Sequence, residues 1–480
     1  MRLYNSRTRA VEKVMPLDGK TIRIYTCGPT VYNFAHIGNF RAYIVADLLK
    51  RALLWRTFSV SHTMNITDVD DKMITNSQKE FPDMEPMEAL LTFGKKYTDA
   101  FWQDYRSLNI LPPDTITKAT DYIIQMQSLI TGIVNKGYGY EKDGSVYFDV
   151  QKYAHDKHYG ELMNIDMSGF KAGARIDADE YEKEHVQDFA LWKAHKEGEP
   201  FWEFELSGKS LPGRPGWHIE CSAMGQDTLG VPFDIHTGGV DLKFPHHEDE
   251  IAQSAIGYGV DVPVNIWMHN EFLNVEGEKM AKSKNNFYTL RDVLEKGYSS
   301  AAIRYVLIST HYRQPLNFTF NGLKAAQEAI ARIQEVMYQS SSISSRHPEE
   351  SADDEGSLPS ILHRANTDIA TALDDDLNIS KALGVLFETI TEINSQKLYS
   401  KPVIDWLQNI DAVLGLGVET PRGGVSASES QELQSLLSQR QKAREKNNFA
   451  LSDTLREQIE SQFKVELRDT EQGQTIKEKP

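Results

Sequence analysis

The stretch Thr21-Ile-Arg-Ile-Tyr-Thr26, followed by Cys27-Gly-Pro29 and His36-Ile-Gly-Asn39, indicates how this chain folds. The apolar and β-branched run predicts a strand, which the Gly-Pro pair ends. The spacing of apolar residues then predicts a helix from about Asn39 to Trp55. A strand, a loop and a helix in this order are typical of a parallel α/β sheet.

The same alternation of strand and helix signals continues through the first 300 residues. Further strands are predicted at Phe58–Asn65, Phe233–His236 and Asn265–His269, and helices at about Met87–Leu108 and Thr117–Lys136. We therefore expect a Rossmann-like parallel sheet over residues 1–300, interrupted by an inserted segment between about 110 and 210.

Beyond about Ser300 the strand signals stop, and a helical tail is expected. Apolar spacing predicts helices at Ala301–Ser309, Gly322–Tyr338, Ile361–Leu373 and Ser380–Asn394. Two polar stretches, Ser340–Pro359 and Val418–Ser428, are typical of a solvated loop and a linker. The chain therefore divides into a helical bundle over 301–417 and a small C-terminal module over 430–480.

Length, charge and hydropathy narrow the class of protein. A chain of 480 residues and 54.5 kDa is expected to form two or three domains. The formal net charge of −17 argues against indiscriminate nucleic-acid binding, but it does not exclude a structured RNA held by a local basic patch. The sequence shows neither a signal-peptide core nor a stretch that could span a bilayer, so we expect a cytoplasmic protein without membrane contact.

The chain has only two cysteines, Cys27 and Cys221, and each stands where a metal ligand is expected. Downstream, His246 and Glu250 are four residues apart and so share one face of a helix. Two thiolates, an imidazole and a carboxylate form a set of ligands that zinc accepts. A disulfide is the alternative, but it is not expected in a cytosolic chain with no other cysteines.

A basic motif, Lys279-Met-Ala-Lys-Ser283, falls in a predicted loop. Lys279 and Lys282 at this spacing can neutralise a triphosphate and the pyrophosphate that leaves it. Considered alone, such a segment is more often an ordinary exposed basic turn. In the same way, His36-Ile-Gly-Asn39 can place a helix N-terminus against phosphate or serve as a structural turn.

Several polar side chains are expected near the ends of the predicted strands. Trp217, His218 and His236 would place an aromatic wall and two imidazoles near the metal, although each alone is more often a packed residue than a ligand contact. The run Asn65–Asp71 can cap a helix or orient a small polar substrate.

Together, these motifs resemble cysteinyl-tRNA synthetase, a class I aminoacyl-tRNA synthetase, from about residue 3 to the C-terminus. The matching motifs, in order, are Cys-Gly-Pro-Thr-Val-Tyr, His-Ile-Gly-Asn, Asn-Ile-Thr-Asp-Val-Asp-Asp-Lys, Pro-Gly-Trp-His-Ile-Glu-Cys-Ser-Ala-Met, Phe-Pro-His-His-Glu-Asp-Glu and Lys-Met-Ala-Lys-Ser. The resemblance implies a catalytic domain over 1–300, a bundle that contacts the tRNA stem over 301–417, and an anticodon-binding module over 430–480. It also implies activation of L-cysteine by ATP with Mg²⁺, transfer to tRNA(Cys), and one zinc ion per chain; we expect a monomer.

The resemblance also assigns individual residues. The zinc ligands would be Cys27, Cys221, His246 and Glu250. The amino-acid pocket would be lined by Thr67, Trp217, His218 and His236. The catalytic ATP signatures would be represented by His36, Asn39, Lys279 and Lys282, and the nucleotide pocket by His269 and Asn270. The anticodon would be read by Arg444, Phe449, Asp453 and Asp469.

Four positions depart from the family pattern. Asn39 replaces a histidine with an amide that can donate to phosphate but carries no charge. Ala281 replaces a serine, Thr237 a glycine and Ile476 a tryptophan. Because both lysines and all four metal ligands are present, we expect activity to be retained.

Three other functions compete with this interpretation. A cysteine-activating ligase of the mycothiol pathway resembles this chain but has no anticodon module, which the tail through Asp469 provides. A catalytically silent RNA-binding paralogue is suggested by Asn39 and Ala281. A zinc hydrolase would share the ligand types but leave the paired lysines without a role.

Overall fold

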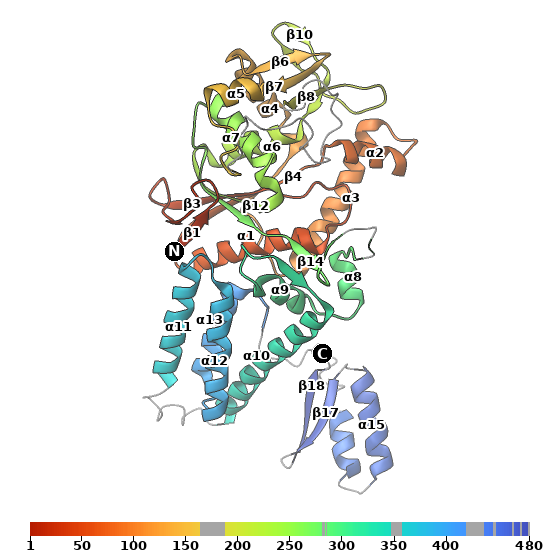
Figure 1. Ribbon diagram of the computed structural model, residues 1–480. Helices are drawn as coiled ribbons and strands as arrows, with labels where there is room; N and C mark the ends of the chain where they lie inside the picture. Colours follow the sequence, from red (N-terminus) through yellow and green to blue (C-terminus); the bar gives the residue numbers. More distant parts are fainter. Residues whose placement is uncertain are drawn as a thin grey trace.

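A five-stranded parallel sheet lies at the centre of the molecule, with its strands in the order β13-β12-β3-β4-β5. The strands are β3 (Thr21–Thr26), β4 (Ser59–Ile66), β5 (Thr115–Lys118), β12 (Phe233–Gly239) and β13 (Val264–Asn270). Helix α1 (Ile37–Trp55) packs on one face and α6 (Trp217–Leu229) on the other, as Figure 1 shows. Covered on both faces, the sheet has the Rossmann-like form that the sequence predicts.

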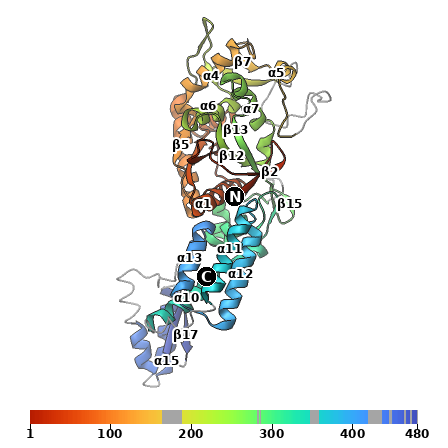
Figure 2. The ribbon, with the colours of Figure 1, turned by 90° about the vertical axis from the view of Figure 1, so that its left-hand side faces the viewer.

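The structure is a computed structural model that describes residues 1–163, 188–280, 284, 286–346, 358–418, 436–444, 448–462, 465–470 and 473–478. The molecule is elongated: the inserted region lies at one end, the sheet and then a helical bundle follow, and a small C-terminal module lies at the other end (Figures 1 and 2). Among the described residues, no helix has the length and apolar character needed to cross a membrane.

Shorter elements surround the sheet. The hairpin of β1 (Arg2–Asn5) and β2 (Ala10–Lys13) lies beside β13. Between β4 and β5 lie α2 (Asp71–Glu80) and α3 (Pro86–Ser107), and α7 (His246–Gly257) joins β12 to β13. A small sheet follows, formed by β14 (Leu273–Val275), β15 (Glu278–Lys279) and β16 (Leu316–Phe318), with α8 (Leu290–Glu295) within its connection.

The inserted region forms its own antiparallel sheet in the order β11-β8-β7-β6. Its described elements are α4 (Ile123–Asn135), β6 (Gly139–Lys142), β7 (Ser145–Phe148), α5 (Val150–Asp156), β8 (Phe189–Ala194), β9 (Glu205–Leu206), β10 (Lys209–Ser210) and β11 (Gly213–Pro215). The predicted helix at Thr117–Lys136 is wrong at its start, because Thr115–Lys118 pairs with β4 as a strand. The β-branched run Thr115-Ile-Thr117 favours this extended form, so the insertion begins after Lys118 and not at about 110; residues 164–187 lie outside the described part.

The helical bundle follows the sheet and shares a continuous apolar core with it. Its helices are α9 (Ser300–Ser309), α10 (Phe320–Arg346), α11 (Leu358–Asp374), α12 (Ile379–Gln396) and α13 (Lys401–Leu414). Two expectations need correction. Strands do not stop at Ser300, since β16 pairs with β14. Ser340, placed in a solvated loop by the sequence, is buried within α10. Residues 347–357 and 419–428 of the two predicted polar stretches lie outside the described part.

The C-terminal module combines helices with a hairpin. Its described elements are a helical segment over 436–444, α15 (Phe449–Gln462), β17 (Val465–Thr470) and β18 (Gly473–Glu478). The tail predicted to be helical therefore contains two antiparallel strands. Leu436, Leu455, Ile459 and Leu467 form a small apolar core of their own.

A buried charge cluster holds α1 against the bundle. The Asp47 carboxylate of α1 accepts from Arg51 Nε (2.9 Å) and from the guanidinium of Arg304 on α9, and Arg304 Nε donates to the carbonyl of Leu414 on α13 (2.7 Å). Asp47 and Arg304 are both almost completely buried. The cluster thereby fixes the junction between the sheet and the bundle.

We expect Asp47→Ala to lower the free energy of unfolding by about 3–5 kcal/mol, because it leaves two buried guanidinium groups without a counter-ion. Denaturant titration of the purified chain measures this loss. Glu392→Ala is a matched control: its partner Arg364 is exposed, and removing such a pair costs at most about 1 kcal/mol. Equal losses in the two variants would contradict a special role for the buried cluster.

Candidate active site and metal centre

The candidate site lies where the sheet reverses its winding direction. From β3 the chain passes through α1 to β4 on one side, whereas β12 pairs with β3 on the other side. Ligands of such sheets bind outside the carboxyl ends of the strands at this position. Cys27 immediately follows β3 and His236 lies within β12, so both reach this position.

The four predicted zinc ligands come together here. Atoms of Cys27, Cys221, His246 and Glu250 that can bind a metal all lie within 4.8 Å of one another, and each side chain is buried. The two Sγ atoms are 3.6 Å apart, far beyond the length of a disulfide bond, and both cysteines are free. His246 Nε2 and Glu250 Oε1, one helical turn apart on α7, are separated by 3.1 Å. This donor set fits a tetrahedral zinc site.

The charges within the cluster also favour a cation. The hydrogen bond from Cys27 lowers the pKa of Cys221 to about 6, whereas burial raises the pKa of Cys27 well above its usual range. Burial alone would raise the pKa of Glu250, but the interactions with His236 and His246 together outweigh burial, and the pKa falls to about 2. For His246, burial lowers the pKa, but the interactions with Cys221 and Glu250 together outweigh burial and raise it to about 10. A proton on His246 thus balances the anionic ligands, and a divalent cation would replace that proton.

A second set of possible ligands overlaps the first. Cys27 and Glu250 also lie within reach of His236 and His247. His236 Nε2 is 3.0 Å from Glu250 Oε2, and His247 Nε2 is 3.5 Å from Cys27 Sγ. The sequence reasoning did not single out His247, although it stands next to His246 in the Pro-His-His-Glu motif. Burial lowers the pKa of His247 well below its usual range, so the ring is neutral.

The predicted amino-acid pocket residues surround this cluster. The Trp217 ring stacks on His246, with centroids 4.3 Å apart and an interplanar angle of 23°. His218 Nδ1 lies 3.0 Å from His246 Nδ1, a contact that orients the ligand ring. Thr67 is buried, and its hydroxyl donates to Glu220, a residue that the sequence reasoning missed.

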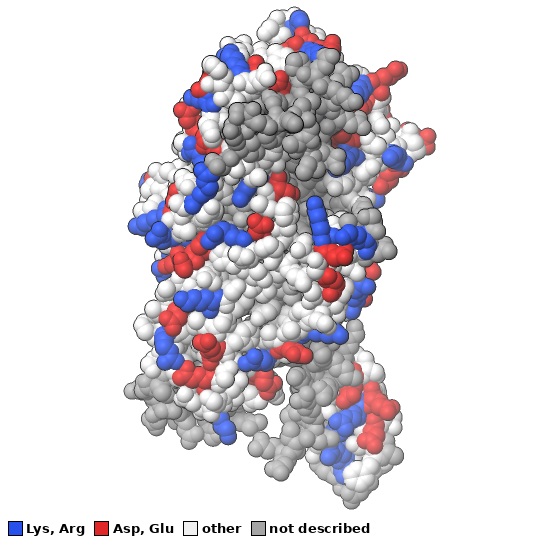
Figure 3. Space-filling model, viewed as in Figure 1, with Lys and Arg blue, Asp and Glu red and all other residues white. Residues whose placement is uncertain are grey.

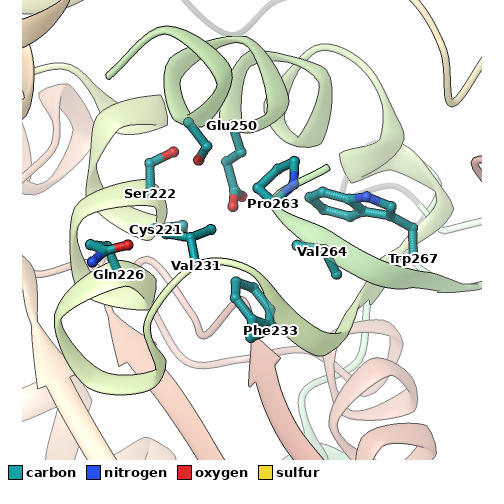
Figure 4. A pocket seen from close by; sticks show the side chains of 10 residues that line it. Cys221, Ser222, Gln226, Val231, Phe233, Glu250, Pro263, Val264 and Trp267 are labelled. Carbon is teal, nitrogen blue, oxygen red and sulfur yellow. The ribbon is translucent and has the colours of Figure 1, made fainter. Parts of the chain in front are cut away.

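Behind the cluster lies a small cavity of about 10 Å³, enough for roughly one water molecule. Cys221 and Glu250 line it, together with Ser222 and Trp267 (Figure 4). Two metal ligands line the cavity, and none of the predicted amino-acid pocket residues does. It therefore belongs to the support of the metal centre.

The two predicted ATP signatures also lie side by side. His36 caps α1: its Nδ1 accepts from the backbone N–H of Asn39 (3.2 Å), and Asn39 Oδ1 accepts from the N–H of His36 (3.1 Å). A Cβ on Gly38 would meet the Met280 methyl at 3.0 Å, so the Lys279-Met280 segment covers the start of α1. Lys279 is exposed on β15, whereas Lys282 and Ala281 lie outside the described residues.

The residues predicted for the nucleotide pocket are buried at the end of β13. His269 Nε2 lies 2.7 Å from His247 Nδ1, and its Nδ1 accepts from Ser6 Oγ or donates to it over 2.8 Å. Asn270 Nδ2 donates to the carbonyl of Glu271. The structure thus places His269 next to the metal cluster.

The predicted anticodon residues all belong to the C-terminal module. The Phe449 ring is 60% exposed at the start of α15, and Asp453 is exposed one turn later. Arg444 is half-buried in the preceding helical segment. Asp469 lies on β17, but its side chain falls outside the described residues. Phe449 and Asp453 share one exposed face of this module.

A parallel sheet with a ligand cluster at its switch point, and with a capped helix N-terminus beside a lysine loop, defines a class I aminoacyl-tRNA synthetase. The family model for the "tRNA synthetases class I (C) catalytic domain" matches residues 13–328, and the DALR domain model matches residues 369–419. The chain belongs to the cysteine--tRNA ligase family.

Relatives along the whole chain support this assignment. The cysteine--tRNA ligase of Leptospira interrogans is 43% identical and covers 98% of both chains. That of Solibacter usitatus is 41% identical and covers 100% of both. Methionyl-tRNA synthetase of Mycobacterium tuberculosis, solved with methionyl-adenylate, has a TM-score of 0.59 at 14% identity, covering 84% of this chain and 92% of its own. At that identity the likeness shows the fold alone.

Proposed function

We propose that this chain activates L-cysteine with ATP and Mg²⁺ to form cysteinyl-adenylate, and then transfers the cysteinyl group to the 3′ end of tRNA(Cys). The observation that carries the proposal is the cluster of two cysteines, a histidine and a glutamate beside the two ATP signatures. Cysteine-dependent ATP–pyrophosphate exchange, measured with and without tRNA, tests it. A silent RNA-binding paralogue would show no exchange, and a cysteine ligase for another acceptor would show exchange without tRNA charging.

Selectivity for cysteine over serine is proposed to rest on zinc held by Cys27, Cys221, His246 and Glu250. Zinc bound there supplies a Lewis acid that favours a soft, readily ionised thiol over a harder and less acidic alcohol. Trp217 closes the pocket through its stacking on His246, and His236 holds Glu250 in place. A hydrophobic pocket alone separates such similar substrates poorly. Coordination of the thiol to the metal is proposed to supply this selectivity in one step, so that no second, hydrolytic site is needed.

The chain's own residues position the nucleotide. At the N-terminus of α1, the backbone N–H of Ile37 donates to the carbonyl of Tyr288 (3.0 Å) and that of Asn39 donates to His36 Nδ1. The positive end of the helix dipole is therefore proposed to attract the phosphate groups there, with His36 and Asn39 beside them. Asn39 uses its Oδ1 on the backbone, which leaves its Nδ2 group as a donor. Lys279 and Lys282 are proposed to stabilise the charge of the pentavalent α-phosphate and of the leaving pyrophosphate. His269 and Asn270 are proposed to support the nucleotide pocket from the end of β13.

Lys282→Ala is expected to slow cysteine-dependent pyrophosphate exchange by about two orders of magnitude, equivalent to about 2.7 kcal/mol of transition-state stabilisation. Ala281→Ser should change the rate only modestly, because it adds no charge. Lys284→Ala is a matched control, since Lys284 is an exposed neighbour that pairs with Glu278 at 2.9 Å. If Lys284→Ala slowed exchange as much as Lys282→Ala, general loss of positive charge would explain both.

The other parts of the chain are proposed to bind tRNA. The bundle over 301–417 would contact the tRNA stem, and the module over 430–480 would read the anticodon through Arg444, Phe449, Asp453 and Asp469. Over the described part of the face in Figure 3, basic and acidic side chains are interspersed, which suits local contacts better than one broad basic surface. We further propose a cytoplasmic monomer, which sedimentation of the purified chain and fractionation of cells can test.

A further inference from the structure

Glu220 is a buried acid that the proposed mechanism does not use. It lies on α6 beside Cys221, with 0% of its surface exposed. Its Oε2 accepts a hydrogen bond of 2.6 Å from the Thr67 hydroxyl. Its Oε1 has no hydrogen-bond partner among the described residues. A carboxyl group buried at this cost is expected to have a task.

The bond to Glu220 fixes what the Thr67 hydroxyl can offer to a ligand. A hydroxyl carries one proton and two lone pairs. The proton is used on Glu220, and one lone pair accepts from Asn65 Nδ2 at 3.2 Å. The capacity that remains is a single acceptor site. This holds for the carboxylate and also for a carboxylic acid that carries its proton on Oε1, because the carbonyl oxygen Oε2 then accepts as a carboxylate oxygen does.

Thr67 is placed close to the metal ligands by a rigid frame. Asn65 Oδ1 accepts from the backbone N–H of Gly28 (2.8 Å) and lies 3.8 Å from Cys221 Sγ. A Cβ on Gly28 would lie 1.6 Å from the Asn65 carbonyl oxygen, so only glycine permits this approach. The side-chain amide of Asn65 therefore contacts both the Thr67 hydroxyl and Cys221. A small amino acid with its thiol beside Cys221 would therefore bring its amino group toward Thr67.

We propose that Glu220 is a positioning residue that keeps the Thr67 hydroxyl turned as an acceptor toward the α-ammonium group of the substrate. An ammonium group has three donors and no acceptor, so it needs an acceptor of this kind. The inference rests on the proposed function and adds a determinant of substrate recognition: the pocket selects a thiol through its metal ligands and an amine through Thr67 and Glu220.

Two ligands separate this role from a merely structural one. L-Cysteine carries the ammonium group, whereas 3-mercaptopropionate has the same thiol and carboxylate without it. For Glu220→Leu, calorimetric titration of the metal-loaded protein should show cysteine binding weakened by about 10- to 100-fold, the range for one hydrogen bond to a charged group. Binding of 3-mercaptopropionate should stay within about threefold of the parent, since it makes no such bond.

Two further variants keep the test decisive if Glu220→Leu folds poorly. Glu220→Gln retains a carbonyl oxygen for Thr67 and should restore cysteine binding. Thr67→Val should weaken cysteine selectively, and combining it with Glu220→Leu should add little, because both remove the same interaction. Asp234→Asn is a control, since Asp234 is an equally buried acid at the start of β12, bonded to the backbone of Arg23.

Equal weakening of both ligands would overturn the inference and leave Glu220 as a structural residue. So would a Glu220→Gln variant as weak as Glu220→Leu, or unchanged cysteine binding in Glu220→Leu. A parent protein that binds no cysteine at all would instead overturn the proposed function.

Discussion

Cys221→Ala, or removal of the metal with a chelator, is expected to abolish cysteine-dependent pyrophosphate exchange while ATP binding is largely retained. The physical reason is the separation of the two sites. Cys221 lies on α6 within the ligand cluster, whereas the proposed phosphate-binding groups lie at the start of α1 and in the loop beside it. Calorimetric titration with cysteine and with ATP measures the two affinities independently. Loss of both to the same extent would indicate unfolding.

The same site should distinguish sulfur from oxygen spectroscopically. In a cobalt-substituted protein, cysteine is expected to perturb the visible absorption, because a thiolate enters the coordination of the metal, and serine is expected to leave it unchanged. Ser222→Ala is a matched control for Cys221→Ala: Ser222 is a buried neighbour on the same helix and is not among the ligands. A metal-free protein that still activated cysteine and rejected serine would contradict zinc-based selectivity.

The metal ligands could be predicted because the sequence offers so few candidates. The chain has two cysteines and a His/Glu pair spaced by one helical turn, and all four side chains are types that bind zinc. These two facts are enough to select the four residues as one candidate ligand set. His247 could not be selected in this way. It adjoins His246 in sequence, and only the rotation of α7 against β13 brings its Nε2 to Cys27 and its Nδ1 to His269.

Errors in the predicted fold arose where short strands follow or precede stronger helical signals. The run Thr115–Lys118 is only four residues long and merges with the apolar spacing of α4, so its pairing with β4 was not evident. The hairpin of β17 and β18 was missed for the same reason. A short two-stranded hairpin gains much of its stability from packing, here against α15, and a local pattern does not report that contact.

Deleting the chain after Val418 is expected to reduce tRNA charging by about three orders of magnitude or more, because two or three base contacts worth about 1–3 kcal/mol each would be lost. Cysteine-dependent pyrophosphate exchange should be largely unchanged. Val418 is retained because it packs into the main core and its N–H donates to Asp411 Oδ2 at 3.0 Å. The deleted module has its own small core, so its removal exposes little of the catalytic core.

A single substitution tests the same division of labour without deleting a domain. The exposed Phe449 ring is suited to stack on a base, and Phe449→Ala should lower charging by about 10- to 100-fold, the range for one lost stacking contact. Leu451→Ala is the matched control, because Leu451 is a similarly exposed apolar residue on α15 without an aromatic face. Neither variant should alter exchange, since both side chains are exposed on the C-terminal module and not in the catalytic core. Parallel losses of charging and exchange, in the truncated chain or in Phe449→Ala, would show that the module supports activation itself and would refute a role confined to tRNA.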